Sequence, residues 1–200
     1  MDLNNKKIGF ALTGSHCTLA ESLPVLEEIV NTAADVVPII SDTVLTRDTR
    51  FGTAKKWLNK IVDITDKSFD SLINSVVEAE PIGPEKLLDL LIIAPCTGNT
   101  MAKIANGIID ETVVMAVKAQ LRNERPVLLA IATNDGLGLN AKNLCVLLNT
   151  PNVFFVPFGQ DNPVKKKNSL VSRFDLIEKA AEYALEYKQI QPVLIEYKGI

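Results

Sequence analysis

The residues of this chain best suited to chemistry are small polar side chains that follow apolar runs. Turns of this kind offer backbone N–H groups, hydroxyls and amides that converge on a polar ligand. The alternative is that they are ordinary turns whose side chains cap the next helix. The turns are Thr13-Gly14-Ser15, Cys96-Thr97-Gly98-Asn99-Thr100 and Thr133-Asn134, and Ser41 follows a fourth apolar run.

The stretch Leu87–Asp110 contains the most informative of these turns. Its apolar run ends at Pro95 and is short and continuous, which is typical of a strand buried on both faces of a parallel sheet. Ligands of open parallel sheets bind at the carboxyl ends of strands, so the turn Cys96–Thr100 is expected to face a ligand. Residues at helical spacing follow the turn: Met101, Ile104, Ala105 and Ile108.

The Gly14-Ser15 turn is a candidate phosphate site. A helix is expected from about Cys17, and the N-terminus of a helix attracts anions. The spacing of Gly9 and Gly14 does not match the GxGxxG fingerprint of dinucleotide sites, and the chain has no Walker loop. These features favour a mononucleotide with one terminal phosphate. His16, next to the turn, is interpreted as a surface or capping residue rather than an acid or base.

Alternating apolar runs and helical patterns indicate an α/β protein. We expect a Rossmann-like, doubly wound parallel sheet of about five strands, three-layered (α/β/α), in a single domain spanning residues 1–200. The expected strands are 7–12, 35–40, 88–94, 127–132 and 152–157. The expected helices include 17–31, 53–64, 68–77, 110–118, 140–148 and 170–187. Polar loops are expected at 41–53 and 161–169, an extended crossing at 80–84 and an edge strand at 192–197.

Composition narrows the classes of function. A net charge of −3 argues against broad nucleic-acid binding, and no apolar run reaches membrane-spanning length. The N-terminal residues carry no segment of signal type, so a cytoplasmic protein is expected. One histidine and three separated cysteines, Cys17, Cys96 and Cys145, predict neither a metal site nor a disulfide framework.

The segment APCTGNTMAKIANGIID resembles the signature of the flavoprotein family that includes the flavin-dependent cysteine decarboxylases. ALTGS, at residues 11–15, resembles the first flavin-phosphate turn of that family, and Ser41 occupies the place of its second phosphate contact. The resemblance implies a flavin, bound by Gly14, Ser15, Ser41, Cys96, Thr97, Asn99 and Thr100. The single phosphate turn and the missing dinucleotide fingerprint favour FMN rather than FAD. The resemblance also implies homo-oligomers with the flavin near the boundary between protomers.

Two departures argue against cysteine decarboxylation, which stays as an alternative. Pro81-Ile82 stands where the decarboxylases carry a catalytic His-Ile pair. Thr133-Asn134 stands where they carry Met-Asn, so the asparagine is kept and the methionine is lost.

Four further segments resemble a narrower group within the family, the B component of a two-component synthase of sporulating bacteria. The segments are TRFG (49–52), AEPIGP (79–84), TNDGLGLN (133–140) and FFVPFGQDNP (154–163). This resemblance implies oxidation of a dihydrodipicolinate-type precursor to dipicolinate in the mother cell. It also implies a partner, the A subunit of the synthase, with its own Rossmann-type nucleotide domain, through which NADP would enter. A non-catalytic, flavin-fold partner protein is the other alternative.

Candidate roles follow for a planar dicarboxylate substrate. Arg50 and a lysine of the run 165–167, taken as Lys166, are expected to bind its carboxylates, together with Asn134. Asn134 and Asp135 are the predicted catalytic residues, with Glu80 as another carboxylate on a rigid segment. Arg50 could instead pair with Asp48 or a helix C-terminus.

Overall fold

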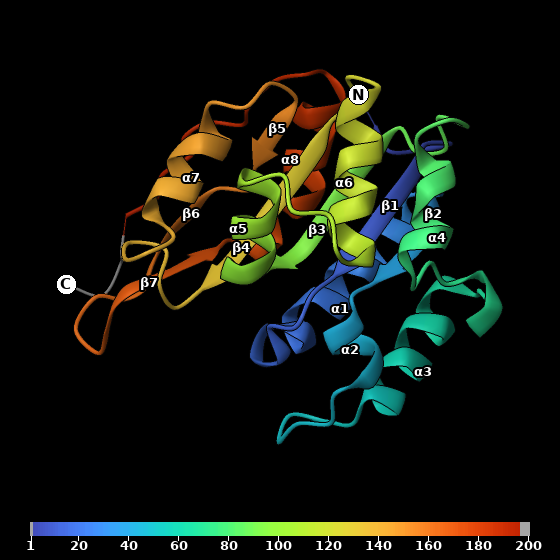
Figure 1. Ribbon diagram of the computed structural model, residues 1–200, viewed down its shortest axis with the longest axis horizontal. Coiled ribbons are helices and arrows are strands. Elements are labelled where there is room, and N and C mark those ends of the chain that lie inside the picture. The colour runs from blue at the N-terminus through green and yellow to red at the C-terminus, as the bar shows by residue number, and fades with distance from the viewer. Residues whose placement is uncertain (1, 197–200) are drawn as a thin grey trace.

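A mixed sheet with helices on both faces forms the centre of the molecule in the computed structural model, which describes residues 2–196 (Figure 1). Seven strands are found in this part of the chain, and the path runs β2-β1-β3-β4-β7-β6, with β5 paired to β4. The strands are β1 (Lys7–Leu12), β2 (Asp35–Ile40), β3 (Leu90–Cys96), β4 (Val127–Thr133), β5 (Val153–Phe155), β6 (Phe158–Asn162) and β7 (Lys166–Ser172).

The first five strands are parallel, as the sequence predicts, and β3 lies between β1 and β4. Every residue of β3 is buried, because helices cover both of its faces. Pro38 lies in β2 at the edge of the sheet, where its missing N–H costs no ladder bond. The doubly wound, three-layer prediction is therefore confirmed.

The helices divide between the two faces of the sheet. Helices α1, α3 and α8 pack in one apolar cluster, and α4 to α7 pack in the other (Figure 1). The helices are α1 (His16–Asn31), α2 (Asp42–Thr46), α3 (Ala54–Thr65), α4 (Val76–Ala79), α5 (Gly98–Ala105), α6 (Thr112–Arg122), α7 (Ala141–Leu148) and α8 (Ile177–Leu185). Helix α1 runs through Pro24 without a restart.

The expected loop at 161–169 is wrong, because these residues lie largely in the antiparallel hairpin β6–β7. The hairpin pairs with β4 through Ala132–Val171 and Thr133–Leu170. In β7 the residues Lys166–Asn168 are exposed while Ser169, Leu170 and Ser172 are buried, so the sequence lacks the apolar and polar alternation that would mark a strand. The expected helix 170–187 accordingly shortens to α8.

Three other segments differ from expectation. Residues 68–77 do not form one helix. They contain a 3₁₀ turn, Phe69–Ser71, and the start of α4, and between these Ile73 exchanges backbone hydrogen bonds with Pro38 and Ile40 at the sheet edge. The crossing at 80–84 begins with a 3₁₀ turn, Glu80–Ile82, rather than an extended segment. The loop 41–53 contains α2. Leu194 forms one bridge to Phe158, and residue 197 of the expected edge strand lies outside the described residues.

Among residues 2–196, no helix combines the length and apolarity needed to cross a membrane. The same residues contain no group of three or more His, Cys, Asp or Glu side chains that could hold a metal ion.

The central strand should dominate stability. Ile92 is 0% exposed between β1 and β4, so Ile92→Ala should lower the free energy of unfolding by roughly 2–5 kcal/mol. Urea unfolding measures the change. Leu139→Ala is the control, because Leu139 is 85% exposed, and it should shift stability by less than about 0.5 kcal/mol. Equal effects of the two substitutions would contradict the burial described here.

Candidate functional site

Thr13 ties the carboxyl ends of β1 and β3 together. Its buried Oγ1 donates a hydrogen bond to the carbonyl oxygen of Pro95, at 2.6 Å, and accepts one from the backbone N–H of Thr97, at 3.1 Å. The donor and acceptor capacity of one hydroxyl thus holds two strand ends side by side. The predicted turns at Gly14-Ser15 and Cys96–Thr100 are therefore neighbours.

Two of the predicted cofactor residues are helix caps. Thr97 Oγ1 accepts a hydrogen bond from the backbone N–H of Thr100 at the start of α5, and the two hydroxyl oxygens lie 3.0 Å apart. Ser41 Oγ accepts a longer one, 3.4 Å, from Val44 in α2. Capping sets these side chains at helix N-termini, where they face the same cavity.

We name this cavity the hydroxyl cavity. It has a volume of about 230 Å³ and collects most of the predicted cofactor residues from three strand ends. None of the described side chains that line it is a lysine or an arginine. The lining residues are Thr13, Gly14, Ser41, Thr43, Thr97, Asn99, Thr100 and Glu111.

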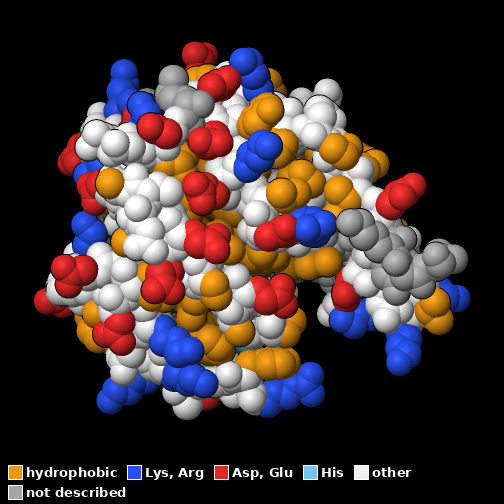
Figure 2. Space-filling view, turned by 180° about the vertical axis from the view of Figure 1, so that it is seen from behind, with side chains coloured by type: hydrophobic (Ala, Val, Ile, Leu, Met, Phe, Trp, Pro, Cys, Tyr) orange, Lys and Arg blue, Asp and Glu red, His pale blue; other side chains and the backbone are white. Residues whose placement is uncertain are grey.

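A second cavity, the hairpin cavity, lies on the other side of the Gly14-Ser15 turn. Its volume is about 260 Å³, and it lies between the start of α1, the end of β4 and the β6–β7 hairpin. Figure 2 shows, at its lower right, a notch between the hairpin and the rest of the molecule. The lining residues are Ser15, Cys17, Thr18, Glu21, Ala132, Thr133, Asn134, Asp161, Lys166, Ser169, Leu170 and Val171.

The structure brings two of the predicted substrate residues, Asn134 and Lys166, together in the hairpin cavity. The Lys166 Nζ atom lies 2.6 Å from the Asp161 Oδ2 atom. The hydrogen bond to Asp161 raises the pKa of Lys166, so its ammonium group stays charged at neutral pH. The cavity therefore holds an amide, Asn134, and a cation, Lys166, that is paired with Asp161.

Asp135 lines neither cavity. Its carboxylate accepts hydrogen bonds from Thr133 Oγ1, at 2.8 Å, and from Asn140 Nδ2, at 2.9 and 3.0 Å. Asn140 in turn accepts a hydrogen bond from Asn143 Nδ2 in α7. A Cβ atom on Gly98 would lie 2.5 Å from Thr133 Oγ1, so α5 packs directly on this turn. The geometry gives Asp135 a structural role, and its predicted catalytic role gains no support.

Arg50 and Cys96 also lie outside both cavities. Arg50 is on an exposed turn, with its guanidinium carbon 4.9 Å from the centre of the Phe51 ring, while Asp48 instead accepts a hydrogen bond from Ala54 N–H. The Cys96 side chain is buried in the core, and burial, with the charge of Glu111, raises the pKa of its thiol to about 12. A neutral, enclosed thiol is a packing group.

Two other residues considered for chemistry, His16 and Glu80, line neither cavity. His16 is largely buried, and neither ring nitrogen has a hydrogen-bond partner among the described residues. Burial lowers its pKa, so the ring is neutral at pH 7. Glu80 is exposed in its 3₁₀ turn.

Sequence reasoning missed Glu111, Cys17 and Glu21. Glu111 immediately follows the signature segment and precedes α6, a position that the helical pattern alone presents as helix rather than cavity wall. Cys17 and Glu21 lie on α1 and face the hairpin cavity. No local signal in the sequence marked Glu111, because the residues that share its cavity come from the distant ends of β1, β2 and β3.

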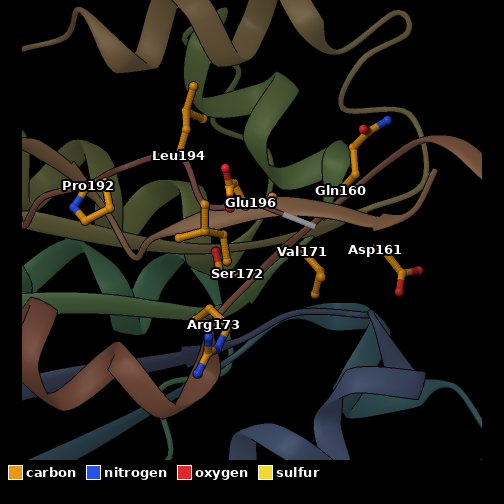
Figure 3. Close-up of a pocket in the computed structure, with 10 residues that line it drawn as sticks. Gln160, Asp161, Val171, Ser172, Arg173, Pro192, Leu194 and Glu196 are labelled. Atoms are coloured by element: carbon orange, nitrogen blue, oxygen red, sulfur yellow. The ribbon is translucent and has the colours of Figure 1, made fainter. Parts of the chain in front are cut away.

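A third cavity, of about 610 Å³, lies at the outer edge of the sheet (Figure 3). It is bounded by the hairpin and by the segment that contains Pro192, Leu194 and Glu196. In Figure 3 the Arg173 guanidinium points away from Leu194 and Pro192, and it donates two hydrogen bonds to the Asp175 carboxylate. None of the predicted site residues lines this cavity.

The model of the Flavoprotein family matches residues 1–180, which is most of the chain. The chain belongs to the Flavoprotein family. The family resemblance seen in the signature segment is thereby confirmed.

Individual proteins resemble the chain over nearly its whole length. The B component of dipicolinate synthase from Bacillus subtilis (strain 168) is 50% identical over 198 residues, covering 98% of both chains. The crystal structure of the same component from Bacillus halodurans C has a TM-score of 0.88 at 49% identity, over 98% of this chain and 99% of that one. Burkholderia xenovorans DmrB, solved in complex with FMN, shares the fold, with a TM-score of 0.62 at 16% identity over 91% and 96%.

The Asp135 contacts predict a stability effect. Asp135→Asn would place an NH₂ group or a neutral oxygen where charged hydrogen bonds now hold Thr133 and Asn140, so unfolding should become easier by about 1.5–3 kcal/mol. Chemical denaturation measures this change. Asp2→Asn, at an exposed position, should leave stability unchanged. Unaltered stability of Asp135→Asn would remove the structural role.

Proposed function

We propose that the chain is the flavin-binding B component of a two-component synthase that oxidises a dihydrodipicolinate-type precursor to dipicolinate. The observation that carries the proposal is the meeting of two different cavities at one glycine turn, Gly14-Ser15. One cavity is rich in hydroxyls, and the other holds Lys166 and Asn134. The end-to-end similarity to the B component of dipicolinate synthase supports the choice of reaction.

The groups that line the hydroxyl cavity are of the kinds that bind FMN. Gly14 lets the backbone approach a phosphate, and the N-termini of α1, α2 and α5 begin at or next to its walls. Ser41, Thr97, Asn99 and Thr100 supply the hydroxyl and amide groups that a phosphate, a polyol and a flavin ring edge require. The FMN complex of DmrB, a protein of the same fold, is consistent with this choice.

The hairpin cavity fits a small dicarboxylate. The Lys166 ammonium group would bind one carboxylate, and the Asn134 amide would donate to the other. Because Arg50 lies outside this cavity in its own chain, the substrate proposal rests on Asn134 and Lys166 rather than on Arg50.

The main task of these residues would be to orient the substrate toward the hydride acceptor. Forming the aromatic pyridine ring removes one hydride and one proton from the dihydropyridine, and aromaticity drives the reaction. A bound flavin, or a nicotinamide held by the A subunit, supplies the hydride acceptor. Asn134 and Lys166 would hold the ring plane, while Glu21 and Asp161 are the carboxylates within the cavity that could take the proton.

The A subunit is proposed as a partner of this chain, and NADP would be bound by that subunit.

A second copy of this chain is proposed to cover an apolar groove. The groove lies between α5 and α6, has a volume of about 410 Å³ and is framed by Lys103, Lys118 and Arg122. Ile108 is half-exposed there. The apolar lining residues are Ile104, Ile108, Ile109, Val114, Val117 and Leu121.

Gly14→Val should abolish FMN binding. A Cβ atom at Gly14 would lie 2.5 Å from the Thr43 Cγ2 atom, and the branched side chain would crowd the wall of the cavity that these two residues share. Flavin absorbance of the purified protein and FMN titration followed by fluorescence measure binding. Gly83→Ala is the control, since its Cβ would meet Ala119 at an ordinary 3.5 Å. Wild-type titration by Gly14→Val would refute this placement of the phosphate.

Lys166→Ala should raise the KM for the precursor by at least about tenfold in enzyme reconstituted with the A subunit, because a charged hydrogen bond to a carboxylate is lost. FMN affinity should not change. Lys167→Ala is the matched control, because Lys167 is an exposed neighbour that lines neither cavity. An unchanged KM would remove Lys166 from the site, and no turnover by the wild-type pair would favour a non-catalytic role.

A further inference from the structure

Glu111 is an acidic lining residue in a cavity that is proposed to bind an anion. It is only 8% exposed, and its Oε1 atom is buried without a hydrogen-bond partner among the described residues. The residue precedes α6, yet its side chain does not cap that helix. A buried carboxylate oxygen without a partner is costly, which indicates that something else satisfies it.

The charged groups around Glu111 do not favour a second anion. Lys103, on α5, places its Nζ atom 3.8 Å from Glu111 Oε1, but the same ammonium lies 2.7 Å from Asp110. Asp42, at the start of α2, adds a third carboxylate, and the Cys96 thiol at the end of β3 is neutral. One cation thus faces three carboxylates.

A phosphate in the hydroxyl cavity would add further negative charge beside this group. The described lining of the cavity contributes no lysine or arginine to offset that charge. Removing the charge of Glu111 relieves the repulsion and turns an orphan acceptor into a donor.

We propose that Glu111 binds the phosphate end of the flavin as a neutral carboxylic acid, so that ligand binding takes up one proton. The protonated carboxyl donates its hydrogen bond to a ligand oxygen, and no covalent bond changes. This inference rests on the proposed flavin site and adds a pH-dependent specificity residue to it.

The direction of the pH effect follows from linkage. Burial raises the pKa of Glu111 above its ordinary value in the free protein, and a bound anion raises it further. Affinity is therefore highest at low pH. As pH rises above the pKa of the free protein, affinity falls by up to about tenfold per pH unit, until the pKa of the complex is passed.

The test compares FMN affinity in the wild type and in Glu111→Gln between about pH 5 and about pH 8. The amide keeps the shape of a neutral carboxyl and its donor, while FMN's own phosphate titrates equally in both proteins. The ratio of wild-type Kd to variant Kd should rise by at least about tenfold across this range. Glu85→Gln, at an exposed position, should behave as the wild type.

Calorimetry of the wild type in two buffers of different ionisation enthalpy adds a second readout. Near neutral pH, binding should take up more protons than FMN's phosphate accounts for, and Glu111→Gln should lose the excess. Parallel pH profiles in the two proteins would overturn the proton uptake and leave the flavin site standing. Binding that requires Mg²⁺ in the wild type and fails in the variant would show an ionised Glu111 and also overturn it. Absence of FMN binding in both proteins, at every pH, would overturn the proposed function and this inference together.

Discussion

The hydrogen bonds of Thr13 set the geometry on which both cavities depend. Its buried hydroxyl links the end of β1 to residues on either side of Cys96 at the end of β3. Ala or Val at this position would leave the carbonyl of Pro95 and the N–H of Thr97 without this partner. The turns after β1 and β3 would then no longer be held together by a hydrogen bond, although the sheet would keep its backbone hydrogen bonds.

The two cavities differ in their electrostatics even though they share one turn. The hydroxyl cavity depends on helix N-termini and hydroxyl groups, and its one ionisable wall among the described residues, Glu111, is acidic. The hairpin cavity has one cation, Lys166, which pairs with the Asp161 carboxylate, and a second carboxylate, Glu21. A ligand would therefore meet helix N-termini and hydroxyls in one cavity and an ion pair in the other.

The parallel strands were predictable because a strand buried on both faces is apolar along its whole length, and this pattern is visible in the sequence. The strands β1 and β2 are apolar runs with the bounds expected. The β6–β7 hairpin was not predictable, because its register depends on pairing with β4 and its outward side chains are lysine and asparagine. Ser41, Thr97 and Thr100 were foreseeable as strand-end residues. The position of Glu111 in the cavity wall was not foreseeable, since the residues around it are distant in sequence. Arg50 was expected to bind the substrate, but a cation in a loop after a strand need not reach the cavity.

The tight packing of Gly98 has an evolutionary consequence. A side chain there would meet Thr133, Asp135 and Asn140 within about 3 Å, so these four positions form one epistatic unit. Drift at any one of them is constrained by the other three, and single substitutions should be tolerated less well than concerted ones. The turn after β4 can therefore diversify in chemistry only when the start of α5 changes with it.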